Sequence, residues 1–278
     1  MEKNSKTFLF NFFLKHKVRA VSWCQFFYNK RRYRYISGKK LIQSKKSDTV
    51  YIFGSGYSIN NITTEEWRQF EKHDTISFNW FLYQKFVRID YHIIKEITPS
   101  ITAFEMNPKL KEYSELLSTN PFYTGAIILI QKGWKAIASN SLIGLNLVSS
   151  DLNYFRYKIC SRNRLVNPSF SLSKGLVHYG TLAMCINFAI VMGWKKIVLV
   201  GVDLYDRRYF WLNKNESRDT DILRGVEVNA THNMGNTTID IISMWNRELE
   251  KRNIELFIYN PKSLLSGILP VFRFTDGD

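Results

Sequence analysis

The stretch IVLVGVDLYDRRYFW, residues 197–211, decides the fold of this protein. Its first four residues, 197–200, are aliphatic and predict a buried strand. A glycine, an aspartate and several aromatic residues follow within a few positions. In open parallel sheets, ligands bind beyond the carboxyl ends of the strands. The stretch therefore predicts a core strand of a parallel sheet, with a site around Asp203 to Tyr209.

Strands and helices alternate on both sides of this stretch. Thr63 and Glu66 stand at capping-box spacing before a helix through Trp67 and Phe70, and a second apolar helix ends at Gly193. This alternation predicts an α/β fold, in which a Rossmann-like, mostly parallel sheet carries helices on both faces. The expected strands are residues 50–53, 75–79, 89–97, 123–131, 196–202 and 254–260, and the two longer expected helices are 180–194 and 237–253.

Two segments lack a periodic pattern. Residues 140–175 are rich in Ser and Asn and predict no regular element. Residues 206–235 form a polar, charged loop, and we expect a small lid there because long loops in compact domains are usually functional. No linker is visible, so residues 48–278 are expected to form one domain.

The net charge of +15 is concentrated in the first 47 residues. Residues 1–47 hold 13 Lys and Arg and one Glu, hence +12, while the remainder holds 26 basic and 23 acidic residues, hence +3. Phe10, Leu14, Val18 and Val21 recur there at helical spacing among lysines and arginines. No apolar run has the length of a membrane span, and the pattern is not that of a secretory signal.

Three interpretations of residues 1–47 stay open. The favoured one is an amphipathic arm on an anionic bilayer surface, which would place the protein peripherally on the cytoplasmic face of a bacterial inner membrane. The second is a helix packed on the body with a solvated charged face. The third is nucleic-acid binding, which the nearly neutral body disfavours because only the arm is basic.

The sequence contains no metal-binding or disulfide pattern. Cys24, Cys160 and Cys185 share no close spacing, which indicates a reducing, cytosolic-side location. The histidines are far apart, and the acidic pair in DTD, residues 219–221, lies in a charged loop and reads as a solvated run. We therefore expect no metal and no cofactor.

Two further stretches are candidates for chemistry. Gly54, Ser55 and Gly56 form a turn after the first strand, where backbone amides can bind phosphate, although a plain tight turn explains this pattern equally well. His232, in the polar loop, has a side chain suited to a general base near neutral pH.

In the order of its elements the chain resembles the sialyltransferases of glycosyltransferase family 42 from mucosal bacteria. The residues that carry the resemblance are the turn after the first strand, the strand ending in Asn79, GWKKIVLVGVDLY (193–205) and YNPKSLL (259–265). The likeness covers roughly residues 48–268. It implies a Rossmann-like (GT-A-like) glycosyltransferase fold with a lid, and an inverting, metal-independent transfer from a CMP-sugar.

The resemblance also implies roles for individual residues. Tyr205 and Tyr209 match tyrosines that hydrogen-bond the leaving phosphate, and His232 matches the base that deprotonates the acceptor hydroxyl. Asp203 is expected to bond backbone amides of the turn. The residues that match donor-binding positions are Gly54, Ser55, Gly56, Ser58, Asn79, Thr181, Asn260 and Ser263.

Four positions depart from the family pattern. Ser55, Trp80, Thr98 and His178 stand where the family has Asn, Gln, Asn and Arg. All four touch donor contacts, so the transferred sugar is expected to be sialic acid or a related CMP-activated ulosonic acid. A distant relative that uses another nucleotide sugar is the alternative. The same departures leave open a non-catalytic nucleotide- or glycan-binding module. The resemblance further implies a cell-surface glycan acceptor, such as lipooligosaccharide or capsule, and the family tends to form homo-oligomers.

Overall fold

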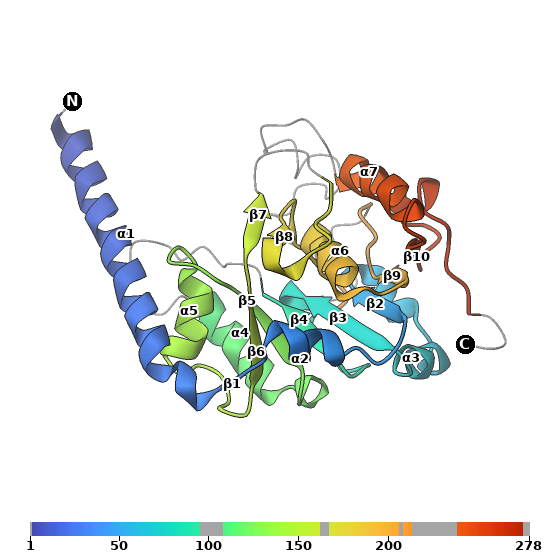
Figure 1. Ribbon diagram of the computed structural model, residues 1–278, viewed down its shortest axis with the longest axis horizontal. Coiled ribbons are helices and arrows are strands. Elements are labelled where there is room, and N and C mark those ends of the chain that lie inside the picture. Colours follow the sequence, from blue (N-terminus) through green and yellow to red (C-terminus); the bar gives the residue numbers. More distant parts are fainter. Residues whose placement is uncertain (1, 95–107, 162–166, 206–207, 213–237, 275–278) are drawn as a thin grey trace.

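A computed structural model describes residues 2–94, 108–161, 167–205, 208–212 and 238–274 of the chain. In the first helix, side chains are described from residue 13 onward, residue 15 excepted. A long helix, α1 (Glu2–Asn29), projects from one end of a body built on a single large sheet (Figure 1). Among the described helices, none is both long enough and apolar enough to span a bilayer.

Eight strands form the central sheet, and every neighbouring pair is parallel. Their order is β1-β6-β5-β4-β3-β2-β9-β10. The expected α/β fold with a mostly parallel sheet is therefore confirmed. The strands are β1 (Arg34–Tyr35), β2 (Thr49–Phe53), β3 (Asp74–Phe78), β4 (Tyr91–Ile93), β5 (Ile127–Gln131), β6 (Asn153–Tyr157), β9 (Lys196–Val200) and β10 (Glu255–Ile258). A second, two-stranded sheet pairs β7 (Ile159–Ser161) with β8 (Leu176–Val177).

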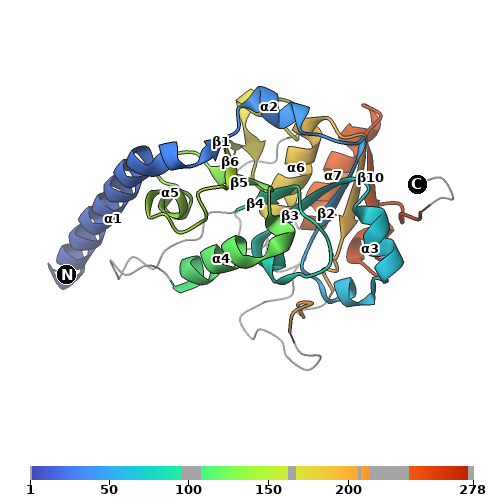
Figure 2. The same ribbon diagram turned by 90° about the horizontal axis from the view of Figure 1, so that it is seen from below.

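Helices cover both faces of the large sheet (Figure 2). One face carries α2 (Gly38–Gln43), α6 (Thr181–Met192) and α7 (Thr238–Glu250), and the other carries α3 (Thr64–Phe70), α4 (Pro108–Thr119) and α5 (Ile137–Gly144). Along β2, Val50 and Ile52 point into the first core, and Tyr51 and Phe53 into the second. Strands buried on both faces are rich in apolar residues, and β2 and β9 are therefore recognisable in the sequence.

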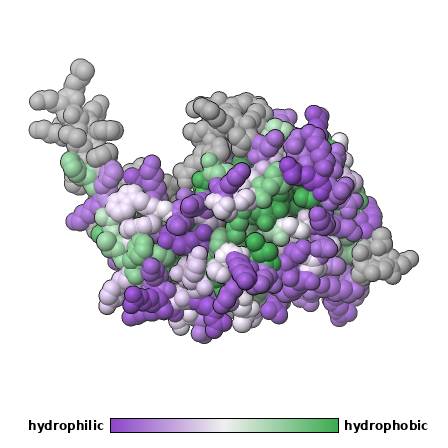
Figure 3. Space-filling view, viewed as in Figure 1, coloured by the Kyte–Doolittle hydropathy of each residue, from purple (hydrophilic) through white to green (hydrophobic). Residues whose placement is uncertain are grey.

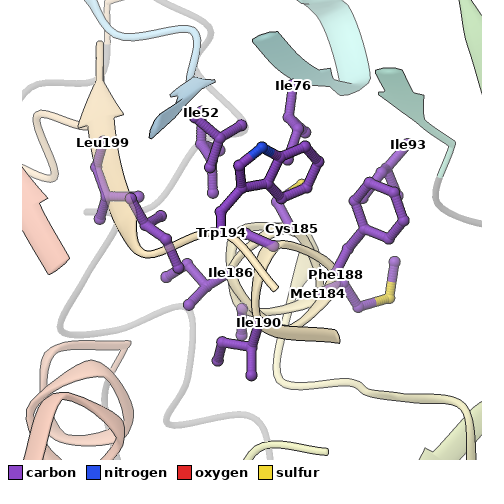
Figure 4. Packing of buried hydrophobic residues seen from close by; sticks show 14 of the residues in the cluster. Ile52, Ile76, Ile93, Met184, Cys185, Ile186, Phe188, Ile190, Trp194 and Leu199 are labelled. Carbon is purple, nitrogen blue, oxygen red and sulfur yellow. The ribbon is translucent and has the colours of Figure 1, made fainter. Parts of the chain in front are cut away.

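The most apolar helix, α6, lies at the centre of the first core. Cys185 and Trp194 contact the strands through Ile52, Ile76 and their neighbours (Figure 4). The indole nitrogen of Trp194 donates to the Asp74 carboxylate at 2.9 Å, at the first residue of β3. The carboxyl end of α6 therefore lies at the amino edge of the sheet, and its amino end lies at the carboxyl edge. Gly193, in the left-handed conformation with φ of 82°, ends the helix as expected.

Residues 30–47 are integrated into the body. β1 pairs with β6, and Leu41 of α2 is fully buried in the first core. In α1, Phe26 is buried and Asn29 donates to the Gly144 carbonyl at 2.8 Å. A side chain at Gly144 would approach the Phe26 backbone nitrogen to 2.8 Å, so glycine allows α1 and α5 to pack closely. The part of the chain just before residue 48 is therefore packed against the body.

The segment expected to be irregular contains regular structure. Residues 137–144 form α5 and residues 153–157 form β6. Ser139, Asn140 and Ser141 are buried in α5, and the side chains of Ser139 and Asn140 have hydrogen-bond partners elsewhere in the chain. The Ser- and Asn-rich composition therefore does not indicate a loop here. The expected lid, 206–235, falls almost entirely outside the described residues.

Candidate functional site

The strand order reverses between β2 and β9. From β2 the chain continues through β3, β4, β5 and β6 on one side, and it returns to β9 and β10 on the other side. The turns that leave two such neighbouring strands diverge to opposite faces, which opens a crevice at the carboxyl edge. This switch point is where the quoted stretch places Asp203 to Tyr209.

The turns after β2 and β9 pack against each other through glycines. The Gly54 and Gly56 amides donate to the carbonyls of Val200 and Gly201 at 2.7 and 2.8 Å. A Cβ on Gly54 would come within 2.5 Å of the Gly201 carbonyl oxygen, and Gly201 itself has φ of 66°. The glycines are therefore required by the close approach of two turns, and both of these amides are already used.

Asp203 joins these turns to the last strand. Its carboxylate is buried and accepts from the Ser58 amide at 2.9 Å, from the Ser58 hydroxyl and from the Asn260 amide group at 2.8 Å. The expectation that Asp203 bonds a backbone amide of the turn is confirmed. A carboxylate suits this position because every group facing it is a donor.

A cavity of about 610 Å³, here called the switch cavity, opens beyond β2, β9 and β10. Among the described residues that line it, three are cationic, Arg208, Lys262 and Arg273, and one is a carboxylate, Glu66. The Arg208 guanidinium lies 4.2 Å from the Tyr57 ring centroid. The wall is therefore net positive with aromatic surfaces, which fits a phosphorylated ligand with a planar ring. The lining residues are Tyr57, Ser58, Asn61, Ile62, Glu66, Gly201, Tyr205, Arg208, Tyr259, Asn260, Pro261, Lys262 and Arg273.

Tyr205 and Tyr209, both expected at the leaving phosphate, lie in different surroundings. Tyr205 lines the switch cavity, is 40% exposed, and its hydroxyl accepts from the Asn260 amide group at 3.4 Å. Tyr209 is 5% exposed and forms an isolated antiparallel β-bridge with Gly56. Its ring centroid lies 4.4 Å from that of Trp211. Of the two, only Tyr205 is among the residues that line the cavity.

The Glu66 carboxylate of the wall is held by a tyrosine. The Tyr259 hydroxyl donates to Glu66, whose other oxygen accepts from the Thr63 amide and hydroxyl. Burial by itself raises the pKa of Glu66, but these hydrogen bonds outweigh it and lower that pKa. Burial and the hydrogen bond to Glu66 raise the pKa of Tyr259. At neutral pH Glu66 is therefore a carboxylate and Tyr259 a protonated donor.

Ser55 and Asn79 lie at the same edge but are not part of the cavity wall. The register pairs Phe53 with Ser77. Ser55 and Asn79, each two residues further along, therefore follow neighbouring strands side by side. Asn79 has φ of 51°, a conformation that asparagine tolerates better than most residues. Its side chain makes no hydrogen bond with another described residue, so its amide remains open to a ligand.

Two other expected donor residues are placed differently. Thr181 is the first residue of α6, at the carboxyl edge but on the face of the sheet opposite α3. Ser263 is buried, donates to the Val202 carbonyl at 2.6 Å and caps the short helix Leu264–Gly267. Ser263 therefore shapes the turn beneath the cavity. His232 and Thr98 lie outside the described residues.

Several cavity residues were missed in the sequence. Arg208 stands inside the quoted stretch, in a pair of arginines shortly after the strand end. A pair of cations at this place is a local pattern that could have predicted a cationic site residue. Lys262 belongs to the YNPKSLL motif. Arg273 and Tyr57 carried no local signal, because they reach the site only through the packing of the last residues and the turn after β2.

Metal ligands are not clustered in the described part of the chain: it contains no group of three or more His, Cys, Asp or Glu side chains that could hold a metal ion. Cys24 and Cys160 are exposed, and Cys185 is buried.

Comparison with known proteins gives structural neighbours only. No protein-family model matches the chain, and no curated protein matches its sequence. One similar solved structure is the sialyltransferase CST-II with a tyrosine-to-phenylalanine substitution, in complex with CMP, at 17% identity and a TM-score of 0.45, covering 82% of this chain and 89% of that one. Another is the sialyltransferase CstII from Campylobacter jejuni in complex with the substrate analogue CMP-3FNeuAc, at 17% identity and a TM-score of 0.42, covering 80% and 85%.

These neighbours are sialyltransferases, as are the proteins that the sequence resembles.

Proposed function

We propose that this protein is a glycosyltransferase that moves a sialic acid or related ulosonic acid from a CMP-sugar to a hydroxyl of a cell-surface glycan. The observation that carries the proposal is the switch cavity. Its described lining is net positive and includes aromatic rings, and it lies where the strand order reverses between β2 and β9. A CMP-sugar presents a planar base and a phosphate diester, and these are the two groups that such a wall binds.

The proposed reaction is a single displacement with inversion. The acceptor oxygen bonds to the anomeric carbon, the bond from that carbon to the phosphate oxygen breaks, and the acceptor proton passes to His232. Charge develops on the departing phosphate. Tyr205 is suited to stabilise it, because Asn260 donates to the tyrosine oxygen and so leaves the phenol proton free for the phosphate. Metal independence is part of the proposal, since phenol and guanidinium donors supply the stabilisation.

Other donor contacts are proposed for the rest of the carboxyl edge. The Asn79 amide, the Ser55 hydroxyl and the amino end of α6 at Thr181 lie along the same edge as the cavity. A helix amino end favours a negatively charged group. We assign these residues to the sugar and nucleotide portions of the donor that extend beyond the cavity.

The proposed setting is the cytoplasmic face of the bacterial inner membrane, in lipopolysaccharide or capsule synthesis. The support is the +12 charge of residues 1–47 and the exposed aromatic residues of α1, including Phe13 and Tyr28. A peripheral attachment of this kind brings the enzyme to lipid-linked glycan acceptors.

A second candidate function is a nucleotide- or glycan-binding module without turnover. Trp80 favours it, because an amide side chain of the family is replaced by an indole that stacks on Tyr83 and meets Tyr113 edge to face. A packed indole of this kind gives up the two hydrogen bonds that an amide offers to the donor.

Ligand-induced thermal stabilisation separates these possibilities. A nucleotide at 100 times its Kd adds about 2.7 kcal/mol, or roughly 5 °C for a chain of this size. We expect selective stabilisation by CMP over UDP, GDP and AMP. Arg273→Gln, in the cavity wall, should weaken CMP binding about tenfold, whereas Arg68→Gln, exposed on α3 outside the wall, should leave it unchanged.

The outcomes have distinct meanings. Stabilisation by UDP or GDP in place of CMP would refute the CMP-sugar assignment. CMP binding with no transfer from any CMP-activated ulosonic acid would favour the binding module. Equal loss of CMP binding in both arginine variants would show that the switch cavity is not the nucleotide site.

A further inference from the structure

A second cavity lies at the opposite end of the sheet, between α1, the edge strand β1 and the neighbouring strand β6. This edge cavity has a volume of about 460 Å³. Four cations line it, together with five aromatic rings. Lys30 and Arg31 belong to the short helix Lys30–Arg32 that follows α1, Lys132 comes directly after β5, and Arg156 belongs to β6. Four strand spacings of about 4.8 Å separate β6 from β2, so the edge cavity lies roughly 20 Å from the switch point.

The four cations of the edge cavity have no acidic partner in the part of the chain that the structure describes. Within the described ranges, none of them lies within 4.0 Å of a carboxylate. The Arg156 guanidinium lies 4.0 Å from the centroid of the Phe26 ring, donates to Asn140 at 2.9 Å, and has a buried Nε without a hydrogen-bond partner. Burial lowers the pKa of Arg156 to about 10. A partly buried cation without a counter-charge is costly, and a bound anion would remove that cost.

An exposed stripe runs along another side of α1. Phe13, Lys17, Val21, Cys24 and Tyr28 lie within about 80° of arc on one side of the helix. Phe13 is 67% exposed and Tyr28 is 81% exposed. We call these five residues the aromatic stripe. The space-filling view shows hydrophobic side chains among hydrophilic ones where the base of α1 meets the body (Figure 3).

We propose that the aromatic stripe inserts into an anionic bilayer and that the edge cavity binds the phosphate of an anionic phospholipid. Exposed aromatic and aliphatic side chains flanked by cations fit the interface of such a bilayer. A second copy of the chain is disfavoured as the occupant, because it would bring one segment of charge +12 against another. RNA is the less favoured anion, because the stripe includes an aliphatic valine and is an outward helix face rather than a groove along a basic strand path.

This inference rests on the membrane part of the proposed function and on no other part of it. It differs from a charged arm acting alone, because it includes a residue of the body. Lys132 lies outside residues 1–47 and is exposed at the cavity rim. A bilayer bound only by the arm would not respond to Lys132.

The test is co-sedimentation of the full chain with vesicles of phosphatidylcholine, with and without phosphatidylglycerol. Each cation near an anionic surface contributes about 1 kcal/mol, so Lys132→Gln is expected to weaken partition roughly fivefold, and Lys30→Gln with Lys132→Gln roughly 30-fold. The matched control is Lys195→Gln, an exposed lysine just before β9 at the other end of the sheet. It should change partition less than twofold, since screening extends over about 10 Å. Melting curves confirm that each variant is folded.

Each result has a defined meaning. Selective loss with Lys132→Gln supports the proposal. Equal loss of vesicle binding with Lys195→Gln would show that binding depends only on the net charge of the protein, and it would overturn the proposal. If the wild type binds anionic vesicles and Lys132→Gln does not matter, the edge cavity is refuted while membrane association stands. If the wild type ignores vesicles, or binds a single-stranded RNA instead through the same lysines, both this inference and the membrane part of the proposed function fail, whereas the CMP experiment is unaffected.

Discussion

Asp203→Asn is the substitution that tests the construction of the site most directly. The carboxylate is 3% exposed and receives three donors on two oxygens, from the Ser58 amide, the Ser58 hydroxyl and Asn260. An asparagine of the same shape has one oxygen and one NH2 group, so in either orientation it turns a donor toward a donor. At least one buried donor is then left unpaired and the remaining bonds lose their charge.

The expected cost is about 3 kcal/mol in the free energy of unfolding, because an unsatisfied buried group costs about 1–3 kcal/mol and bonds to a charged partner are the stronger ones. Ser58→Ala is the control, since it removes one hydroxyl and leaves the carboxylate with the Ser58 amide and Asn260. It should cost about 1 kcal/mol. Both values are measured by urea unfolding, with the slope compared to confirm that the same surface unfolds.

A double-mutant cycle adds a second criterion. In the Asp203→Asn background, Ser58→Ala should cost less than it does alone, because its partner has already lost its charge. The reasoning is refuted if Asp203→Asn costs no more than Ser58→Ala, or if the two effects are simply additive. In that case the turn after β2 would be held by its glycine contacts and not by the carboxylate.

Three further predictions concern other parts of the structure. Burial lowers the pKa of His92 to about 3, so between pH 6.5 and 4 this side chain takes up a proton in the unfolded chain but not in the folded one. The free energy of unfolding should therefore fall by about 3 kcal/mol over this range. His92→Gln should flatten this pH dependence in unfolding experiments from pH 4 to 7. Gly56→Ala places a Cβ 2.4 Å from an Asp203 oxygen, so it should cost about 1–3 kcal/mol by thermal unfolding, and a neutral result would mean that the turn has room. Tyr205→Phe should lower the transfer rate about 100-fold with CMP binding retained, and a larger loss in Tyr209→Phe would move the phosphate contact to the buried tyrosine.

Much of the architecture was readable from local patterns. The apolar runs of β2 and β9, the helix that ends at Gly193 and the capping box of Thr63 and Glu66 all form as predicted. Each depends on interactions within a few residues or on burial of both faces, so each leaves a local signature. Leu110, Tyr113 and Leu117 of α4 also recur at helical spacing, so this helix too has a local signature in the sequence.

Other features depend on partners that are distant in the chain. The buried Ser139 and Asn140 of α5 look like loop residues, and the helix tolerates them because the amide of Gln131, the carbonyl of Gly133 and the guanidinium of Arg156 satisfy them. No local pattern reports such partners, because burial of a polar group is decided by what packs over it.

The amino-acid sequence by itself determined the class of the fold, since hydrophobic periodicity shows which segments form buried strands and helices. It also predicted a site at the strand ends, and the family resemblance gave Asp203 its expected role in bonding the turn. Only the tertiary structure decided which residues share a site. Packing brings Arg208, Lys262 and Arg273 into one wall and keeps Tyr209 out of it. It also places Lys132 beside α1 at the far edge. The physical reason is that a parallel sheet gathers its strand ends by topology, so neighbours in space are set by strand order and not by distance along the chain.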